Sequence, residues 1–170
     1  IDLAGRSFRD FIDGKIPELP GERASIKDWA DHTTTLFPEV RLKTYLEMRG
    51  ADAGPWSRLC ALPALWTGVF YDDAALAAAW DLCKHWTAED RAGLRRDVPR
   101  LGLKAQVAGR SAQDVAKDFV AIAKQGLKAR AHLNGGFLDE TIYLGDLEEI
   151  AATGITPAER LLALYDGAWK

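Results

Sequence analysis

The sequence predicts an α+β protein that is mostly helical and contains one or two β-strands. From residue 56 onward, apolar residues recur at intervals of three and four, which is the spacing of one face of an α-helix. Residues 39–49 instead alternate polar and apolar side chains, which is the pattern of a β-strand. With 170 residues, the chain is long enough for one domain with a real core and too short for two comfortable ones.

Composition narrows the classes of partner. The net charge of −3 offers no electrostatic reason to expect nucleic acid or an anionic membrane. The longest apolar run, residues 59–71, has the length of a buried helix and not of a membrane span. The two cysteines, Cys60 and Cys83, lie in apolar helical contexts, so we expect buried free thiols and a cytoplasmic location.

Two short helices are expected before the alternating segment. Ser7 precedes the first, over residues 8–12, as a capping side chain. A loop rich in proline and glycine follows over residues 15–22. Ser25 then begins a capping pattern for a second, brief helix that runs through Trp29.

The alternating segment is predicted to be one strand that carries a row of polar side chains on one face. These are Glu39, Arg41, Lys43, Tyr45, Glu47 and Arg49. Gly50 and the Gly54-Pro55 pair end the strand. For an arbitrary strand, such a row is more often a solvated surface than a site. Here carboxylates and cations mix closely beside a glycine-rich turn, which also suits an anionic ligand and its metal.

Several helices are predicted after the strand. Pro55 suits the first turn of a helix, and Pro63 should kink the apolar run that follows. The next helix covers residues 74–86, and Thr87 caps another that ends before Pro99.

The C-terminal third is also predicted to be helical. Ser111 begins one helix, and a glycine pair separates it from another over residues 138–152. Thr156 and Pro157 combine a capping box with a proline at the first helical position. The apolar side chains of this last helix should dock it on the others; they are Leu161, Leu164 and Tyr165.

Only the region from residue 39 to 52 concentrates groups that chemistry could use. Glu47 and Arg49 are two apart on a strand and are therefore neighbours on one face. A carboxylate can hold Mg²⁺, and an arginine can bind phosphate with two parallel hydrogen bonds. From spacing alone, an ordinary Glu–Arg ion pair is the better explanation. No Walker-type loop, Gly-x-Ser-x-Gly elbow or His-Glu-x-x-His motif is present in the sequence.

The same region carries a family resemblance. Residues 48–52 read Met-Arg-Gly-Ala-Asp, and residues 58–66 read Arg-Leu-Cys-Ala-Leu-Pro-Ala-Leu-Trp. Together with residues 154–162, these segments are similar to glutamate–cysteine ligase of the plant and proteobacterial type. The likeness extends over nearly the whole chain, and the Met-Arg-Gly-Ala-Asp block is highly specific.

The resemblance implies a glutamine-synthetase-like fold, in which a curved antiparallel sheet forms a funnel with helices outside. The family's enzyme is well over twice this size, so residues 1–170 correspond to its C-terminal portion. Residues 1–54 would hold the sheet and active-site part, and residues 55–170 the helical part. We expect the chain to be inactive without the missing N-terminal portion. A homodimer is compatible with this resemblance.

The implied reaction is the ATP-dependent ligation of the glutamate γ-carboxylate to the cysteine amine, the first step of glutathione synthesis. It passes through γ-glutamyl phosphate and releases ADP and phosphate, with Mg²⁺ as the metal. By resemblance, Glu47 is a Mg²⁺ ligand and Arg49 is the catalytic cation on the phosphate. Arg41, Tyr45 and Asp52 are assigned to the same ATP site by neighbourhood only.

Two other readings remain open from the sequence. The chain could belong to a related carboxylate–amine ligase that uses a different amine, because a strand that serves ATP and metal says nothing about the acceptor. It could also be a helical interaction module without catalysis.

Overall fold

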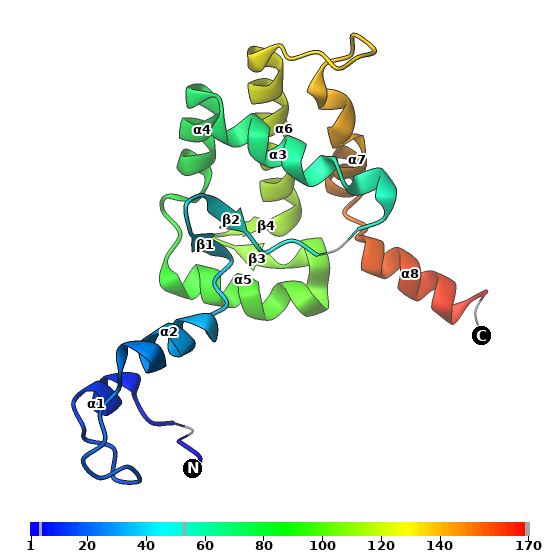
Figure 1. Cartoon of the computed structure of the whole chain (residues 1–170). Coiled ribbons are helices and arrows are strands. Elements are labelled where there is room, and N and C mark those ends of the chain that lie inside the picture. The colour runs from blue at the N-terminus through cyan, green and yellow to red at the C-terminus, as the bar shows by residue number, and fades with distance from the viewer. Residues whose placement is uncertain (4, 53, 169–170) are drawn as a thin grey trace. The chain divides into compact units, whose positions relative to one another are not determined.

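The computed structural model describes residues 1–3, 5–52 and 54–168. The chain divides into two compact units, Ile1–Asp52 and Ala53–Lys170, which are described separately (Figure 1). The first unit is small and holds two helices and a hairpin. The second is helical apart from one short hairpin. The predicted α+β class with a mostly helical content is therefore confirmed.

The first unit contains α1 (Phe8–Ile12), α2 (Ile26–Thr34), β1 (Val40–Leu42) and β2 (Leu46–Met48). Both helices begin at the predicted serines. Ser7 accepts a hydrogen bond from the Arg9 amide, and Ser25 forms a capping box with Asp28. The second helix continues beyond Trp29 to Thr34. Its His32 ring stacks on Phe8, with 4.1 Å between ring centroids, so an aromatic contact joins the two helices.

The prediction of one continuous strand over residues 39–49 is wrong, because the segment forms a hairpin. Strands β1 and β2 pair antiparallel, with Arg41 opposite Glu47. The chain reverses between them, where the Lys43 amide donates to the Tyr45 carbonyl at 2.9 Å. The alternation of side chains continues within each strand. The turn contains neither glycine nor proline and therefore left no turn signal in the sequence.

The second unit is arranged around one long helix, α6 (Ala112–Arg130). Helices α3 (Ala61–Phe70), α4 (Asp73–Cys83) and α7 (Gly145–Thr153) pack against it (Figure 1). The other elements are η1 (Trp56–Arg58), α5 (Ala88–Leu101), η2 (Gly102–Lys104), β3 (Gln106–Val107), β4 (Arg110–Ser111), η3 (Glu140–Leu144) and α8 (Pro157–Asp166).

The helix starts predicted from capping residues are accurate in this unit. The side chains of Asp72, Thr87, Ser111 and Thr156 each accept a hydrogen bond from a first-turn amide of the helix that follows. Two other predicted starts are displaced: Pro55 precedes only the 3-10 turn η1, with α3 beginning at Ala61, and the helix predicted from residue 138 begins at Gly145. Among the described residues, no helix is both long enough and apolar enough to cross a lipid bilayer.

The core lies where α3 crosses α6. Ala64, Val69, Ala123, Leu127 and Leu144 form its buried cluster. Glycines allow the two helix backbones to approach closely. A Cβ added at Gly126 would lie 1.8 Å from the Gly68 carbonyl oxygen, and one added at Gly68 would lie 2.2 Å from the Ala123 oxygen. Side chains larger than hydrogen are therefore excluded at both positions.

Neither internal proline acts as predicted. Pro63 does not kink its helix, because α3 begins at Ala61 and the proline lies in the first turn, where its missing amide would have no intrahelical partner. Helix α5 does not stop before Pro99 but continues to Leu101. The missing donor there affects only the last turn before Gly102, whose φ of 55° ends the helix.

Other departures concern exposure. Leu161, Leu164 and Tyr165 do not dock α8 on the rest of the unit, since they are 48–56% exposed. Cys60 is exposed rather than buried, and Cys83 is half-buried. The β3–β4 hairpin was not predicted from the sequence. Its turn places Ala108 at a φ of 48° and Gly109 at 77°. Alanine rarely adopts a positive φ, so the sequence did not indicate a turn of this type.

Candidate functional site

Three of the predicted site residues meet on the β1–β2 hairpin. Arg41 Nε donates a 2.7 Å hydrogen bond to Glu47 Oε2 across the strand pair. Arg49 Nε lies 3.9 Å from the same oxygen. Their side chains are 26–36% exposed, so the trio is partly buried.

The cations around Glu47 hold it in the charged form. The hydrogen bond from Arg41 is the main cause that lowers the pKa of Glu47 below its ordinary value. The positive charges of Arg41, Lys43 and Arg49 act in the same direction, while partial burial opposes them. Glu47 is therefore a carboxylate at neutral pH, as a metal ligand must be.

Arg49 is fixed by its backbone and by an aromatic ring. Its amide donates to the Glu39 carbonyl at 2.8 Å, which extends the strand pairing by one residue. Its guanidinium carbon lies 5.3 Å from the centroid of the Phe37 ring. Phe37 was missed as a contributor to this site. The only signal was a large aromatic residue beside the Pro38 that precedes the strand.

One donor of Arg49 has no acceptor among the described residues. Its Nη1 is buried and makes no hydrogen bond. A buried donor without an acceptor is costly, and the cost is greater for a charged group. A phosphate oxygen has the chemistry that would satisfy such a donor.

Tyr45 and Asp52 are not brought into this group. Tyr45 lies in the hairpin turn and is 58% exposed. Asp52 is exposed at the end of the first unit. Within the part of the chain that the structure describes, no hydrogen bond or ion pair joins either residue to Glu47 or Arg49.

The hairpin can supply one ligand to Mg²⁺ but cannot form a complete metal site. Glu47 offers a carboxylate, and Mg²⁺ is often held by one or two carboxylates together with substrate phosphates. One of its oxygens is already engaged by Arg41. Residues 1–3, 5–52 and 54–168 contain no cluster of three or more His, Cys, Asp or Glu side chains that could hold a metal. Mg²⁺ usually takes its remaining ligands from water and substrate phosphates.

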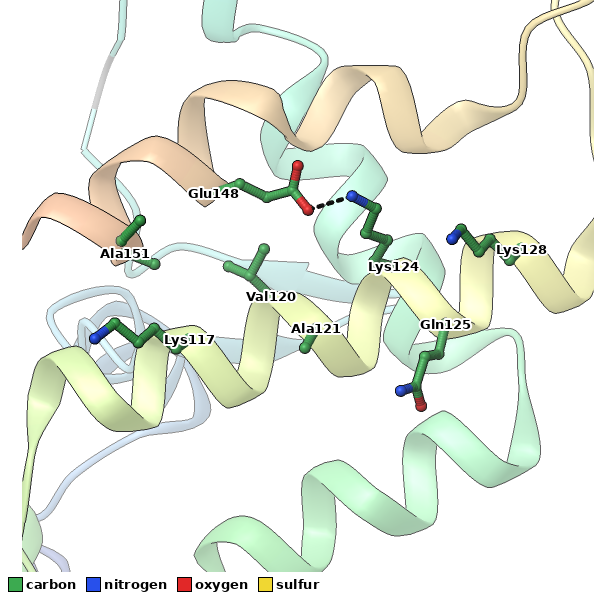
Figure 2. A pocket seen from close by; sticks show the side chains of 9 residues that line it. Lys117, Val120, Ala121, Lys124, Gln125, Lys128, Glu148 and Ala151 are labelled. Atoms are coloured by element: carbon green, nitrogen blue, oxygen red, sulfur yellow. Dashed lines mark hydrogen bonds and ion pairs between the residues drawn. The ribbon is translucent and has the colours of Figure 1, made fainter.

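A second cationic region lies between α6 and α7, in a hollow of about 370 Å³ (Figure 2). Lys117, Lys124 and Lys128 line it from one side of α6; Lys117 and Lys124 are about two helical turns apart, and Lys124 and Lys128 about one. Lys124 Nζ reaches across to Glu148 of α7 at 2.5 Å, and Lys117 Nζ lies 3.9 Å from Asp114. Two of the three lysines therefore have carboxylate partners, and the region is a solvated, ion-paired helix surface.

An apolar cleft lies between α4, α5 and α6, with a volume of about 370 Å³. Cys83, Trp86 and Phe119 are among the side chains that line it, and no charged side chain does. It offers no groups for catalysis. Of the three regions, the β1–β2 hairpin is therefore the best candidate for a functional site.

Comparison with known proteins identifies the class of this chain. The family model for glutamate–cysteine ligase family 2 matches residues 6–170. The chain belongs to this family. The matched residues include the β1–β2 hairpin and all of the described helices.

Plant enzymes are among the relatives of this chain. The chain is 52% identical to the chloroplastic glutamate–cysteine ligase of Solanum lycopersicum and 51% identical to that of Arabidopsis thaliana, over 99% of the chain in both cases. It is 49% identical to chloroplastic glutamate–cysteine ligase A of Oryza sativa subsp. indica over its whole length. The match spans only 31–33% of these relatives, so the chain corresponds to about a third of their length.

The expected cytoplasmic location is wrong by this comparison, because the relatives that match nearly the whole chain are named chloroplastic. The expectation rested on unpaired thiols and an ordinary composition. Those features fit any reducing compartment, whereas an organelle address is carried by a separate targeting segment.

Proposed function

We propose that this chain is the part of a glutamate–cysteine ligase that contacts the phosphates of ATP during the ligation of glutamate to cysteine. The reaction joins the glutamate γ-carboxylate to the cysteine amine through γ-glutamyl phosphate and releases ADP and phosphate. Family membership and about 50% identity to named ligases support the reaction. The observation that carries the role of the chain is the buried, unpartnered Nη1 of Arg49 beside the ionised Glu47.

Each hairpin residue has a distinct task in this proposal. Arg49 binds and orients the transferring phosphoryl group and stabilises its charge, and Phe37 holds the guanidinium in place. Glu47 supplies one oxygen ligand to Mg²⁺, which when bound neutralises phosphate charge. Arg41 keeps Glu47 ionised and oriented.

In this proposal, other parts of the enzyme supply the rest of the active site. The matched region is about a third of the relatives' length, and the hairpin provides one carboxylate ligand. Further metal ligands and the glutamate and cysteine sites would lie in the remaining portion. The chain alone would therefore be inactive, and formation of γ-glutamylcysteine by the purified 170-residue chain would contradict this part of the proposal.

The test measures ATP-dependent formation of γ-glutamylcysteine by the complete ligase that contains this chain. Replacing Arg49 by alanine should lower kcat at least about 100-fold, because a cation at the transferring phosphate acts mainly in the transition state. Glu47→Gln should raise the Mg²⁺ concentration needed for half-maximal activity.

Lys43→Ala provides the matched control, because Lys43 is an exposed cation in the turn of the same hairpin. It should change kcat less than about threefold. An Arg49→Ala enzyme with kcat close to that of the Lys43→Ala enzyme would overturn the assignment.

A further inference from the structure

Helix α8 is amphipathic, with well-separated sides. At 100° per residue, its large apolar side chains share one side with Ala158. They are Leu161, Leu162, Leu164 and Tyr165. Glu159, Arg160 and Asp166 lie on the other side. In water, a helix of this kind normally packs its apolar side on its own domain.

The contacts of α8 with its own unit come from the polar side. Glu159 Oε1 lies 3.3 Å from Lys104 Nζ, and Arg160 Nη2 donates a 2.8 Å hydrogen bond to Glu149. The first turn also packs Thr156 closely against Gly102. The helix is therefore attached by its start and by its polar side.

The apolar side is left in solvent. Leu161, Leu162, Leu164 and Tyr165 are 55%, 58%, 48% and 56% exposed. Figure 1 shows α8, in orange and red, extending away from α5 and α7 of its own unit. An isolated ten-residue helix is marginal in water, so α8 needs a surface to pack on.

The comparisons place α8 inside the shared family region. The family model extends to residue 170, and the rice relative matches the whole chain, so α8 is not an appended tail. The relatives contain about twice as much additional sequence as the matched region. Helix α8 is therefore part of the region that the chain shares with these relatives.

The exposed area argues against a second copy as the covering surface. At half exposure, each large side chain offers roughly 100 Å², so the four offer roughly 400 Å². A stable interface between separate chains buries about 800 Å² per partner. A contact within one polypeptide needs less area, because the linked segments have a high effective concentration.

We propose that the apolar side of α8 docks on a complementary apolar surface in the portion of the same ligase outside these 170 residues. In this role, α8 helps to join the helical unit to the rest of the enzyme. The proposal rests on family membership and on the exposure of α8, and not on the phosphate chemistry of the hairpin. It therefore stands or fails separately from the proposed function.

Amide hydrogen exchange, compared between the 170-residue chain and the complete ligase, tests the proposal. We expect α8 amides to exchange at least about tenfold more slowly in the complete ligase, while α6 amides are protected in both. Leu161→Asp should remove this added protection of α8. Ala163→Asp is the matched control, because it places the same charge on the polar side of the same helix: any unfavourable effect of the charge on the helix itself is shared with Leu161→Asp, and the protection that comes from docking should remain.

Two outcomes would overturn the proposal. Equal exchange of α8 in the chain and in the complete ligase would mean that no further portion covers it. Protection in the chain alone that rises with protein concentration, together with the mass of a dimer, would assign the surface to a second copy. The comparison of unmutated proteins decides between these results even if Leu161→Asp fails to fold.

Discussion

The α3–α6 crossing and the β1–β2 hairpin bury opposite kinds of side chain. At the crossing, small and aliphatic residues are enclosed, and no polar or charged residue is buried in any described part of the chain. In the hairpin, the charged trio is half-buried, while Val40, Leu42 and Leu46 are 44–78% exposed. The crossing completes its own core. The hairpin has an apolar face that the described residues leave open, which fits a strand pair belonging to a larger sheet.

The closest backbone approach in the crossing provides the largest expected effect. Replacing Gly126 by alanine would place Cβ 1.8 Å from the Gly68 oxygen and 3.0 Å from the Ala75 Cβ. Backbone atoms cannot move aside as a flexible side chain can, so α3 and α6 must separate. We expect the free energy of unfolding to fall by at least about 3 kcal/mol, measured by urea unfolding with far-ultraviolet circular dichroism.

Gly93→Ala is the matched control for that substitution. Gly93 lies inside α5, and an added Cβ would meet only the end of the Arg96 side chain at 3.6 Å. Alanine should stabilise the helix there by about 0.5–1 kcal/mol, because glycine is the poorer helix former. A loss of less than about 1 kcal/mol at Gly126 would show that the crossing tolerates more space than its geometry indicates.

A leucine in each region gives a second test of the difference. Leu127 is fully buried in the α3–α6 core, whereas Leu42 of the hairpin is 78% exposed. Leu127→Ala should cost about 2–5 kcal/mol in thermal or urea unfolding of the chain. Leu42→Ala should change stability by less than about 0.5 kcal/mol. Similar losses at both positions would mean that the hairpin face is covered in solution.

The helix starts could be predicted from the sequence, whereas the contacts between elements could not. Helix starts were predictable because capping is local: a serine, threonine or aspartate contacts an amide two or three residues later. The α3–α6 crossing was not predictable from the sequence. A glycine inside a helix is locally unfavourable, and the reason for Gly68 and Gly126 is the close approach of the partner helix.

The hairpin shows where periodicity is ambiguous. Alternation continues through β1 and β2 in the same phase, so the pattern of residues 39–49 fits one strand as well as two. The residues at Arg41, Glu47 and Arg49 were named from the sequence, but the Arg41–Glu47 hydrogen bond requires the chain reversal. The roles of Tyr45 and Asp52 rested on sequence neighbourhood, and the fold places neither in the charged group.

The smallest expected effect concerns the ionisation of Glu47. Its folded pKa is lowered, chiefly by the hydrogen bond from Arg41, so the carboxylate stabilises the hairpin at neutral pH. That contribution diminishes below the ordinary glutamate pKa and is lost as the pH falls through the lowered one. Carbon-13 NMR titration should show that Arg41→Gln raises the Glu47 pKa more than Arg49→Gln does, because Arg41 donates at 2.7 Å while Arg49 lies at 3.9 Å.

The same titration can separate the two regions. Because the α3–α6 core contains no titratable side chain, the loss caused by Leu127→Ala should be equal at acid and neutral pH. Lys43→Gln should raise the Glu47 pKa less than Arg41→Gln does, since Lys43 acts through charge without a hydrogen bond. A larger rise with Arg49→Gln than with Arg41→Gln would mean that Arg49 is the main partner of Glu47. Its guanidinium would then be committed to the carboxylate instead of to a phosphate oxygen.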